Sequence, residues 1–236
     1  MMNMTSRSDS TESDVAFIIP AYNEGAAVRH TIASIPDDFS YIVAVNDGSR
    51  DDTLSQIKKT RARVVSHPVN LGQGAALQTG LDFALLNPNI KYFVTYDADG
   101  QHRIEDVRKM LNYIKEHNVD VVLGSRFLGE AKNMPKLKGL ILKLAGWFSN
   151  TTSGVRLTDT HNGLRVLNRN AAEQMKLEMP DFSHASEIIE RISQKELSYA
   201  EVPVTIIYTD YSRAKGQSMI NAINISFDIL LNRLMK

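Results

Sequence analysis

The chain has 236 residues, of which 43% are hydrophobic, so it can bury the core of one α/β domain. Lysine plus arginine and aspartate plus glutamate both number 27, which excludes the net basic charge typical of nucleic-acid-binding proteins. The absence of cysteine excludes disulfides and thiolate metal sites and is compatible with a reducing cytoplasm.

The amino-terminal segment, residues 1–14, is polar and rich in serine and threonine, without the apolar run of a signal peptide. We therefore expect a disordered tail there. Lys138, Lys143 and Asp228 interrupt the best candidates for a membrane-spanning helix, which needs roughly 18 apolar residues. We expect a cytoplasmic protein, at most peripheral at the inner face of the cell membrane.

Residues 15–123 alternate between predicted strands and predicted helices. Apolar, β-branched runs predict strands at residues 15–19, 41–45, 63–66, 91–96 and 120–123. Helical spacing covers residues 24–34, 51–60, 74–86 and 103–117. This alternation predicts an α/β fold with a mostly parallel, doubly wound sheet flanked by helices. Because ligands of such sheets bind beyond the carboxyl ends of the strands, we expect the turns at residues 20–24, 46–49 and 97–99 to form one site.

The second half of the chain departs from this alternation. Its predicted elements are an amphipathic helix at residues 135–150, a strand at 163–167, a helix at 184–195 and a strand at 197–208. The 135–150 helix has apolar and basic faces, which suit core packing or the headgroup boundary of a membrane. Pro203 lies within the last strand, which favours an edge position or a bulge. A connector at residues 209–217 leads to an amphipathic helix at 218–236, which would dock on the domain, a second subunit or a membrane protein.

Two carboxylates end the apolar run at residues 92–96. Side chains two positions apart in an extended segment point the same way, so Asp97 and Asp99 can face one point. Two hard oxygen ligands suit Mg²⁺ or Mn²⁺, which usually shares its coordination shell with substrate phosphates. The pair therefore predicts a protein that handles a diphosphate. A solvated acidic turn and a phosphatase-type nucleophile motif are the alternatives, but the latter normally closes the first strand of its domain.

Five motifs occur in order along the chain, at residues 18–24 (IIPAYNE), 45–53 (VNDGSRDDT), 70–74 (NLGQG), 97–102 (DADGQH) and 124–127 (GSRF). Together they resemble the inverting family 2 glycosyltransferases of GT-A fold, particularly the dolichyl- and polyprenyl-phosphate sugar synthases. The resemblance covers roughly residues 15–217 and implies a single GT-A domain, followed by the helix at 218–236.

The resemblance implies a nucleotide-sugar donor site. The residues it places at the donor are Pro20, Tyr22, Asn23, Glu24, Asp47, Ser49, Gly72, Asp97, Ala98 and Asp99. It implies that Asp97, Asp99 and Gln101 hold the metal ion. Many relatives have lysine where this chain has Gln73, so a direct cation on the donor is in doubt at that position. An ordinary turn at residues 47–48 and a surface loop at 70–74 are the alternatives.

The resemblance also implies an acceptor site. Arg126 and Arg165 would meet phosphate, for which arginine geometry is well suited. Arg213 and Lys215 lie in the connector at residues 209–217, which we expect either to close over the phosphates as a basic loop or to be a solvated linker. Asp99, Asp159, Glu187 and Arg126 are the implied catalytic residues. Glu187 would act as a base only for a hydroxyl acceptor, because a phosphate acceptor is already anionic. The alternatives are a surface salt bridge for Arg126 and a helix surface for Glu187.

These observations predict a metal-dependent inverting glycosyltransferase with a UDP- or GDP-linked sugar as donor and polyprenyl phosphate as acceptor. One alternative is transfer to a hydroxyl of a cell-surface polysaccharide or lipopolysaccharide precursor in cell-envelope biosynthesis, with Glu187 or Asp159 as base. From other classes, the alternatives are a non-catalytic nucleotide-sugar-binding module serving a membrane partner and a metal-dependent phosphohydrolase. A homodimer is compatible with the last helix.

Overall fold

The computed structural model describes residues 12–134, 139–140, 142–143, 146–147, 150, 154–178 and 183–209. The first eleven residues of the expected tail, part of the predicted 135–150 helix, the helix at 218–236 and the basic residues Arg213 and Lys215 lie outside them. Residues 12–14, the end of the expected tail, contact the folded domain. Glu12 pairs with Lys115 at 2.7 Å, and the carbonyl oxygen of Asp14 accepts hydrogen bonds from the backbone N–H groups of Lys91 and Tyr92.

The described residues form a seven-stranded sheet in the order β3-β2-β1-β4-β6-β5-β7. The strands are β1 Val15–Ala21, β2 Tyr41–Asp47, β3 Arg63–His67, β4 Tyr92–Thr95, β5 Val121–Lys132, β6 Arg165–Asn168 and β7 Tyr199–Ile207. Only β6 runs antiparallel to its neighbours among the pairs of this sheet, so the expected mostly parallel sheet is confirmed.

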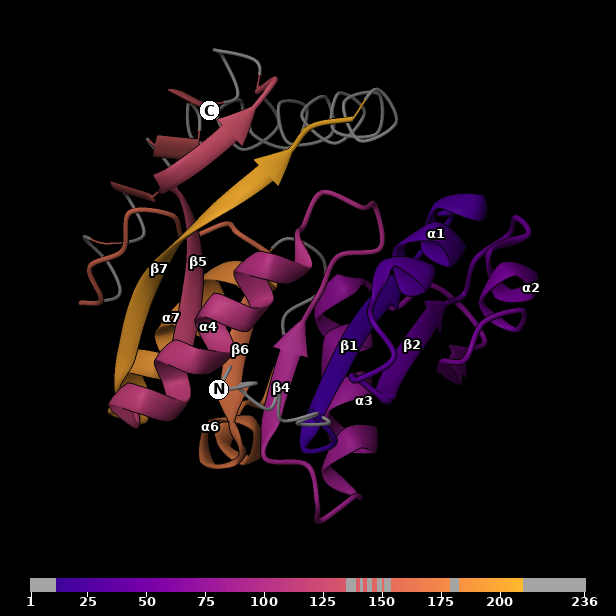
Figure 1. The fold of residues 1–236 in the computed structure, drawn as a ribbon, viewed down its shortest axis with the longest axis horizontal. Helices are drawn as coiled ribbons and strands as arrows, with labels where there is room; N and C mark the ends of the chain where they lie inside the picture. Colours follow the sequence, from indigo (N-terminus) through magenta and orange to yellow (C-terminus); the bar gives the residue numbers. More distant parts are fainter. Residues whose placement is uncertain are drawn as a thin grey trace, which may run out of the picture.

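Helices cover both faces of the sheet (Figure 1). They are α1 Ala26–Ser34, α2 Thr53–Ile57, α3 Gln73–Leu85, α4 Ile104–His117, α6 Arg169–Gln174 and α7 Ser183–Gln194. In the view of Figure 1, α4 lies in front of the sheet and α7 behind it. The sheet has one hydrophobic core on each face, and β1 contributes to both. Phe17 packs with α1 and α4 on one face, and Ile18 packs with α3 on the other. A strand buried on both faces reads as a continuous apolar run, which is why β1 was predictable.

Within the described residues, the predicted elements are found with shifted ends, and the helix expected at residues 51–60 covers only Thr53–Ile57. Two differences are larger. β5 continues nine residues past the expected end at Leu123, reaching Lys132, and pairs with β7 through a register shift between Ser125 and Glu130. Its second half is polar and was therefore hidden from an analysis of apolar runs. The short helix α6 was not predicted; the side chain of Asn168 caps it by accepting a hydrogen bond from Ala171 N.

The predicted edge position of Pro203 is confirmed, because β7 is the last strand of the sheet. Figure 1 shows β5 and β7 extending together beyond the other strands. A Cβ at Gly129 would overlap the backbone of Val204, so a glycine allows β5 to approach β7 closely there.

The buried carboxylate of Asp106 ties α4 to β7. Its side chain accepts a hydrogen bond from Thr205 N at 2.8 Å and lies 2.9 Å from Lys109 Nζ. We expect Asp106→Ala to lower the free energy of unfolding by about 2–3 kcal/mol, because it leaves a buried N–H without its charged partner. Urea denaturation measures the change. Lys109→Ala, which removes only the exposed partner, should cost less than about 1 kcal/mol; equal losses would contradict this role for Asp106.

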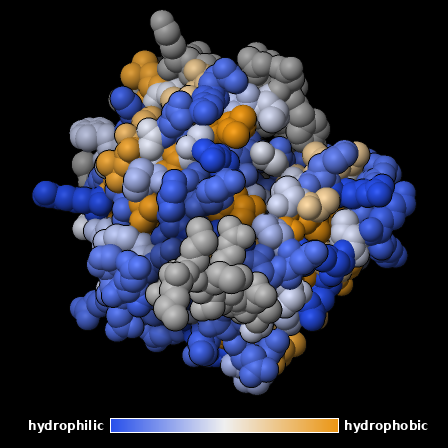
Figure 2. All heavy atoms as spheres, viewed as in Figure 1, coloured by the Kyte–Doolittle hydropathy of each residue, from blue (hydrophilic) through white to orange (hydrophobic). Residues whose placement is uncertain are grey.

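The surface carries several exposed hydrophobic side chains. Figure 2 shows a mostly hydrophilic face with hydrophobic side chains in scattered groups. Large exposed apolar residues include Leu128 on β5, Leu140 and Trp147, the last with 68% of its surface accessible. No helix in the described part of the chain has the length and apolar character needed to cross a membrane.

Candidate active site

Three polar turns meet at the carboxyl ends of β1, β2 and β4, as the fold class predicted. In the sheet register, Ala21 at the end of β1 lies beside Asn46 of β2, and Ile18 lies beside Thr95 at the end of β4. The parallel arrangement therefore brings residues 20–24, 46–49 and 97–99 to one edge.

The turn after β1 is held by the turn after β2. Asn23 N donates to Ser49 Oγ at 3.1 Å, and the Asn23 side chain accepts from Arg50 N at 2.9 Å. Glu24 is buried, and its N–H donates to Thr53 Oγ1 at 2.8 Å. Two further donor candidates differ in exposure, since Pro20 is buried within β1 and Tyr22 is 37% exposed. The structure thus brings together the donor residues expected from these two motifs.

Asp47 ends β2 and orders the loop at residues 70–72. Its two carboxylate oxygens accept hydrogen bonds from Leu71 N and Gly72 N, each at 2.9 Å, and its Oδ1 lies 2.7 Å from His67 Nδ1. Gly72 has a φ of 94°, which a side chain would disfavour. Asp47 therefore holds the loop at residues 70–72 through its backbone N–H groups, and His67 is a partner that the sequence did not indicate.

The acidic pair lies at the end of β4. Asp97 Oδ2 is 2.9 Å from His102 Nε2, and Asp97 Oδ1 accepts a 3.3 Å hydrogen bond from Gln73 Nε2. Asp99 accepts hydrogen bonds from Gln101 N at 3.1 Å and Gln101 Nε2 at 2.7 Å. The side chain of Gln73 thus contacts the carboxylate of Asp97. The intervening Ala98 buries its methyl group in the core, so its contribution is to space the two carboxylates.

The surroundings shift the pKa values of Asp97 and Asp99 in opposite directions. Burial opposes ionisation of Asp97, but the hydrogen bond and charge of His102 and the charges of Arg165 and His184 lower its pKa to about 2. Burial and the neighbouring charge of Asp97 raise the pKa of Asp99 to about 6. Two crowded carboxylates of this kind favour a divalent cation between them.

The oxygen ligands available at this site suit a divalent cation. Carboxylate oxygens from Asp97 and Asp99 and the amide oxygen of Gln101 are hard ligands. Within the described residues, no group of three or more histidine, cysteine, aspartate or glutamate side chains could hold a metal ion. A cation bound here would take further ligands from elsewhere, as Mg²⁺ commonly does from substrate phosphates.

A buried ion pair joins β5 to the loop before β6. Arg126 N and Nε both donate to Asp159 Oδ2, at 2.9 and 2.6 Å. The same guanidinium donates to Tyr208 Oη at 2.7 Å and to the carbonyl oxygen of His161 at 3.1 Å. Burial works against its charge, but Asp159 and Tyr208 raise the pKa of Arg126 above its usual range. Contacts within the described residues use three of its five N–H donors, so two are left for an anionic ligand.

Arg165 places a second cation in this cluster. It is 2% exposed, and its Nε and Nη1 atoms have no hydrogen-bond partner within the described residues. Burial lowers the pKa of Arg165 to about 10 against the opposing charges of Asp97 and Asp159. Its backbone lies beside Thr95 at the end of β4 and beside Leu123 of β5. Arg165 is therefore placed to stabilise negative charge near Asp97.

Gly163 supports the acidic pair and was not singled out by the sequence. A Cβ at this position would overlap the carboxylate of Asp97. Its carbonyl oxygen accepts a 2.6 Å hydrogen bond from Thr95 Oγ1. Only the folded chain shows that this glycine faces the carboxylate of Asp97.

Glu187 lies in α7 with its carboxylate engaged. It is 4% exposed and accepts hydrogen bonds from Glu178 N at 2.9 and 3.1 Å. Arg191 Nη2 lies 3.5 Å from the same carboxylate. These contacts hold the segment before α7, and the catalytic assignment of Glu187 stays a prediction.

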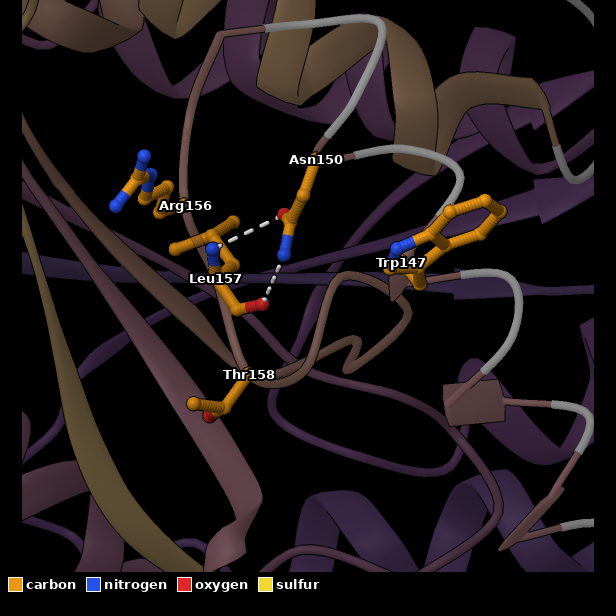
Figure 3. Close-up of a pocket in the computed structure, with 5 residues that line it drawn as sticks. All are labelled: Trp147, Asn150, Arg156, Leu157 and Thr158. Carbon is orange, nitrogen blue, oxygen red and sulfur yellow. Dashed lines mark hydrogen bonds between the residues drawn. The ribbon is translucent and has the colours of Figure 1, made fainter.

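A pocket of about 550 Å³ adjoins the Asp159 loop. Its lining residues are Trp147, Asn150, Arg156, Leu157 and Thr158. Figure 3 shows Trp147 and Arg156 on opposite sides of Asn150, whose side chain bonds the backbone of Leu157 at 3.1 and 2.8 Å. Thr158 connects the pocket to β5, since its hydroxyl lies 2.6 Å from Ser125 Oγ. The pocket therefore combines an apolar wall, a cation and a link to Arg126.

Comparison with known proteins identifies one family and several similar proteins. The family model "Glycosyl transferase family 2" matches residues 16–175. A UDP-N-acetylglucosamine–dolichyl-phosphate N-acetylglucosaminyltransferase of Methanococcus voltae is 29% identical, over 94% of this chain and 97% of that one. A polyprenol monophosphomannose synthase of Mycolicibacterium smegmatis is 28% identical, over 88% of this chain and 81% of that one.

The fold is also found in a solved structure. Glucosyl-3-phosphoglycerate synthase of Mycobacterium tuberculosis, crystallised with Mn²⁺ and UDP-glucose, superposes with a TM-score of 0.65. The match covers 84% of this chain and 71% of that one at 19% identity. The expected GT-A fold is confirmed.

Proposed function

Because this chain belongs to glycosyl transferase family 2, we propose that it moves a sugar from a nucleotide diphosphate to a polyprenyl phosphate, with inversion at the anomeric carbon. The observation that carries the proposal is the placement of the acidic pair beside buried cations. Asp97 and Asp99 face the donor edge of the sheet, and Arg165 and Arg126 lie in the adjoining charge cluster. Such a site can hold a diphosphate through a cation and an acceptor phosphate through arginine.

The donor side of the proposed reaction uses the turns after β1 and β2. The residues at 20–24 and 47–49 would border the nucleoside, and the glycine-containing loop at residues 70–74, held by Asp47, would bring backbone close to the donor. Asp97, Asp99 and Gln101 would hold Mg²⁺ or Mn²⁺. The chemistry supplied by that ion when bound is neutralisation of the charge on the departing nucleoside diphosphate.

The acceptor side uses the buried arginines. A phosphate oxygen of the acceptor would attack the anomeric carbon from the face opposite the diphosphate. The bond between carbon and the diphosphate oxygen breaks, and its electron pair leaves with the nucleotide. Arg126, fixed by Asp159, would hold the acceptor phosphate in line, with Arg165 stabilising negative charge behind it. Arg213 and Lys215 would complete the phosphate site.

The engaged carboxylates favour a phosphate acceptor over a hydroxyl acceptor. A hydroxyl needs a general base, and the two candidates are Asp159 and Glu187. Asp159 forms an ion pair with Arg126, and Glu187 accepts two hydrogen bonds from a backbone N–H. An anionic phosphate needs neither residue as a base. The named relatives act on dolichyl phosphate and polyprenol phosphate, which supports the same class of acceptor.

A polyprenyl acceptor places the enzyme at a membrane surface. The exposed side chains of Leu128, Leu140 and Trp147 would meet the lipid boundary, with Lys143 supplying a nearby positive charge. We propose peripheral association at the inner face of the cell membrane.

Glu187→Gln separates the two acceptor classes. We expect this variant to transfer sugar to polyprenyl phosphate within about threefold of the wild-type kcat, because no base is required. Its free energy of unfolding should fall by about 1–2 kcal/mol, because the N–H of Glu178 would no longer donate its hydrogen bond to a charged carboxylate. Glu190→Gln, at an exposed position of the same helix, is the matched control. A loss above about 100-fold confined to a glycan hydroxyl acceptor would identify Glu187 as a base. An equal loss with both acceptors would show that its role is structural or in donor binding.

The proposed function is tested by incubating the purified protein with UDP- and GDP-linked sugars, Mg²⁺ or Mn²⁺, and a short polyprenyl phosphate. Mass spectrometry should find one polyprenyl-phosphate sugar. Release of inorganic phosphate from the donor without an acceptor would indicate a phosphohydrolase. Donor binding without turnover would indicate a binding module, and transfer only to a glycan hydroxyl would refute the phosphate acceptor.

A further inference from the structure

Glu201 on the edge strand β7 binds the loop that carries Asp159. Its carboxylate accepts hydrogen bonds from Thr158 N at 2.9 and 2.8 Å, from Thr158 Oγ1 at 2.9 Å and from Asp159 N at 3.1 Å. Three donors of two consecutive residues thus converge on one side chain. A carboxylate is the side chain suited to this arrangement, because it only accepts hydrogen bonds and has about four acceptor sites.

The same loop fixes the guanidinium of Arg126. Asp159 Oδ2 accepts from both Arg126 N and Arg126 Nε, so a shift of the Asp159 backbone would move the ion pair. The far side of the guanidinium is bound by Tyr208, which follows β7 directly. One edge strand therefore holds the Arg126 site from two sides, through Glu201 and Tyr208.

The position of Glu201 in the sheet explains its reach. Glu201 of β7 lies beside Leu123 of β5, and Leu123 precedes Arg126 by three residues. Thr158 bonds both Glu201 of β7 and Ser125 of β5, and it lines the pocket shown in Figure 3. Glu201 therefore connects the sheet, the Arg126–Asp159 ion pair and the pocket wall.

We propose that Glu201 is a positioning residue for sugar transfer, which fixes the Thr158–Asp159 peptide and thereby the direction of the Arg126 guanidinium. This proposal rests on the proposed function of Arg126 as the group that holds the acceptor phosphate. Glu201 contacts neither substrate itself. Its effect should appear in transfer and acceptor binding and not in donor binding, because the donor turns lie on β1, β2 and β4.

Glu201→Gln tests the proposal, because it places an amide NH₂ against the backbone N–H donors. We expect kcat/KM for the acceptor to fall about 100-fold, the loss that misplacement of a catalytic group can cause. The donor KM should stay within about threefold of wild type. Glu201→Asp keeps the charge at a shorter reach and should recover part of the rate. Glu173→Gln, an exposed ion-pair residue on α6, is the matched control for the substitution.

Two further readouts separate positioning from general stability. In ¹H–¹⁵N spectra, hydrogen exchange at Arg126 Nε–H should accelerate at least about tenfold in Glu201→Gln, because its 2.6 Å bond to Asp159 is loosened. In an Arg126→Ala background, Glu201→Gln should cause less than about a threefold further loss of transfer, since the two residues act as a unit. Unchanged exchange at Arg126, or independent multiplication of the two losses, would overturn the proposal.

The exchange measurement also keeps the two proposals distinct. A wild-type protein that transfers no sugar to polyprenyl phosphate would refute the proposed function, whereas the response of Arg126 Nε–H would still report on Glu201. If Glu201→Gln does not fold, Glu201→Asp provides the same readout. Wild-type exchange at Arg126 in a folded Glu201→Asp variant with impaired transfer would show that Glu201 acts elsewhere.

Discussion

Asp99→Asn should lower kcat by at least about 1,000-fold while the protein stays folded. The substitution removes one of two carboxylates that would hold the cation, and charge stabilisation by a metal ion contributes several kcal/mol, where each 1.36 kcal/mol is tenfold in rate. Stability should not fall. Burial and the charge of Asp97 raise the pKa of Asp99 to about 6, so at pH 7 the ionised group opposes folding and its neutral isostere relieves that opposition. Steady-state transfer and urea denaturation at pH 7 without added metal measure the two effects.

Asp82→Asn is the matched control, since Asp82 is exposed on α3 and bonds only Gln78 among the contacts of the described residues. It should change neither kcat nor stability appreciably. Turnover near wild type in Asp99→Asn would exclude a catalytic cation at this pair, and loss of folding would show that the carboxylate is structural.

Gly163→Ala should abolish at least about 99% of transfer through a single added methyl group. The new Cβ would overlap the Asp97 carboxylate, so either the carboxylate or the loop at residues 159–163 must move. Movement of the carboxylate would displace a proposed metal ligand, and movement of the loop would displace Asp159 from Arg126. Both changes misplace reacting groups, for which losses of about 100-fold are typical. Transfer kinetics and the affinity for Mn²⁺ in the presence of nucleoside diphosphate measure the result.

Gly146→Ala controls for the loss of a glycine, because its Cβ would meet Thr160 Oγ1 at 3.6 Å, an ordinary contact. Its transfer rate should stay within about threefold of wild type. Equal activity of Gly163→Ala and Gly146→Ala would show that Asp97 does not need its observed position.

The first half of the fold was predictable because its strands are buried on both faces. β1, β2 and β4 read as apolar runs, and the fold class then placed their terminal turns at one edge without knowledge of any contact. The fold-class rule was therefore sufficient to bring the turns at residues 20–24, 46–49 and 97–99 to one edge of the sheet. The expectation that Asp97 and Asp99 share one side of an extended segment was wrong, because β4 ends at Thr95 and residues 98–99 form a turn; their charges are nonetheless close enough to interact.

The acceptor side was less predictable because its contacts join distant segments. Arg126 meets Asp159 33 residues away and Tyr208 82 residues away, and Glu201 reaches Thr158 across 43 residues. The extension of β5 past Leu123 is polar and pairs with an edge strand, so it lacks the apolar pattern that marks a buried strand. Motif resemblance named Arg126 and Asp159 but gave no sign that they bind each other.

A crystal structure with Mn²⁺ and a nucleoside diphosphate, with the cation located by its anomalous scattering, tests directly whether the acidic pair holds a metal-bound diphosphate. We predict one strong peak in coordination contact with both Asp97 and Asp99, bridging to the two phosphoryl groups, with the nucleoside against the turns after β1 and β2. A cation or diphosphate bound away from these carboxylates, or nucleotide bound at full occupancy with no cation between it and the pair, would contradict the proposed mechanism.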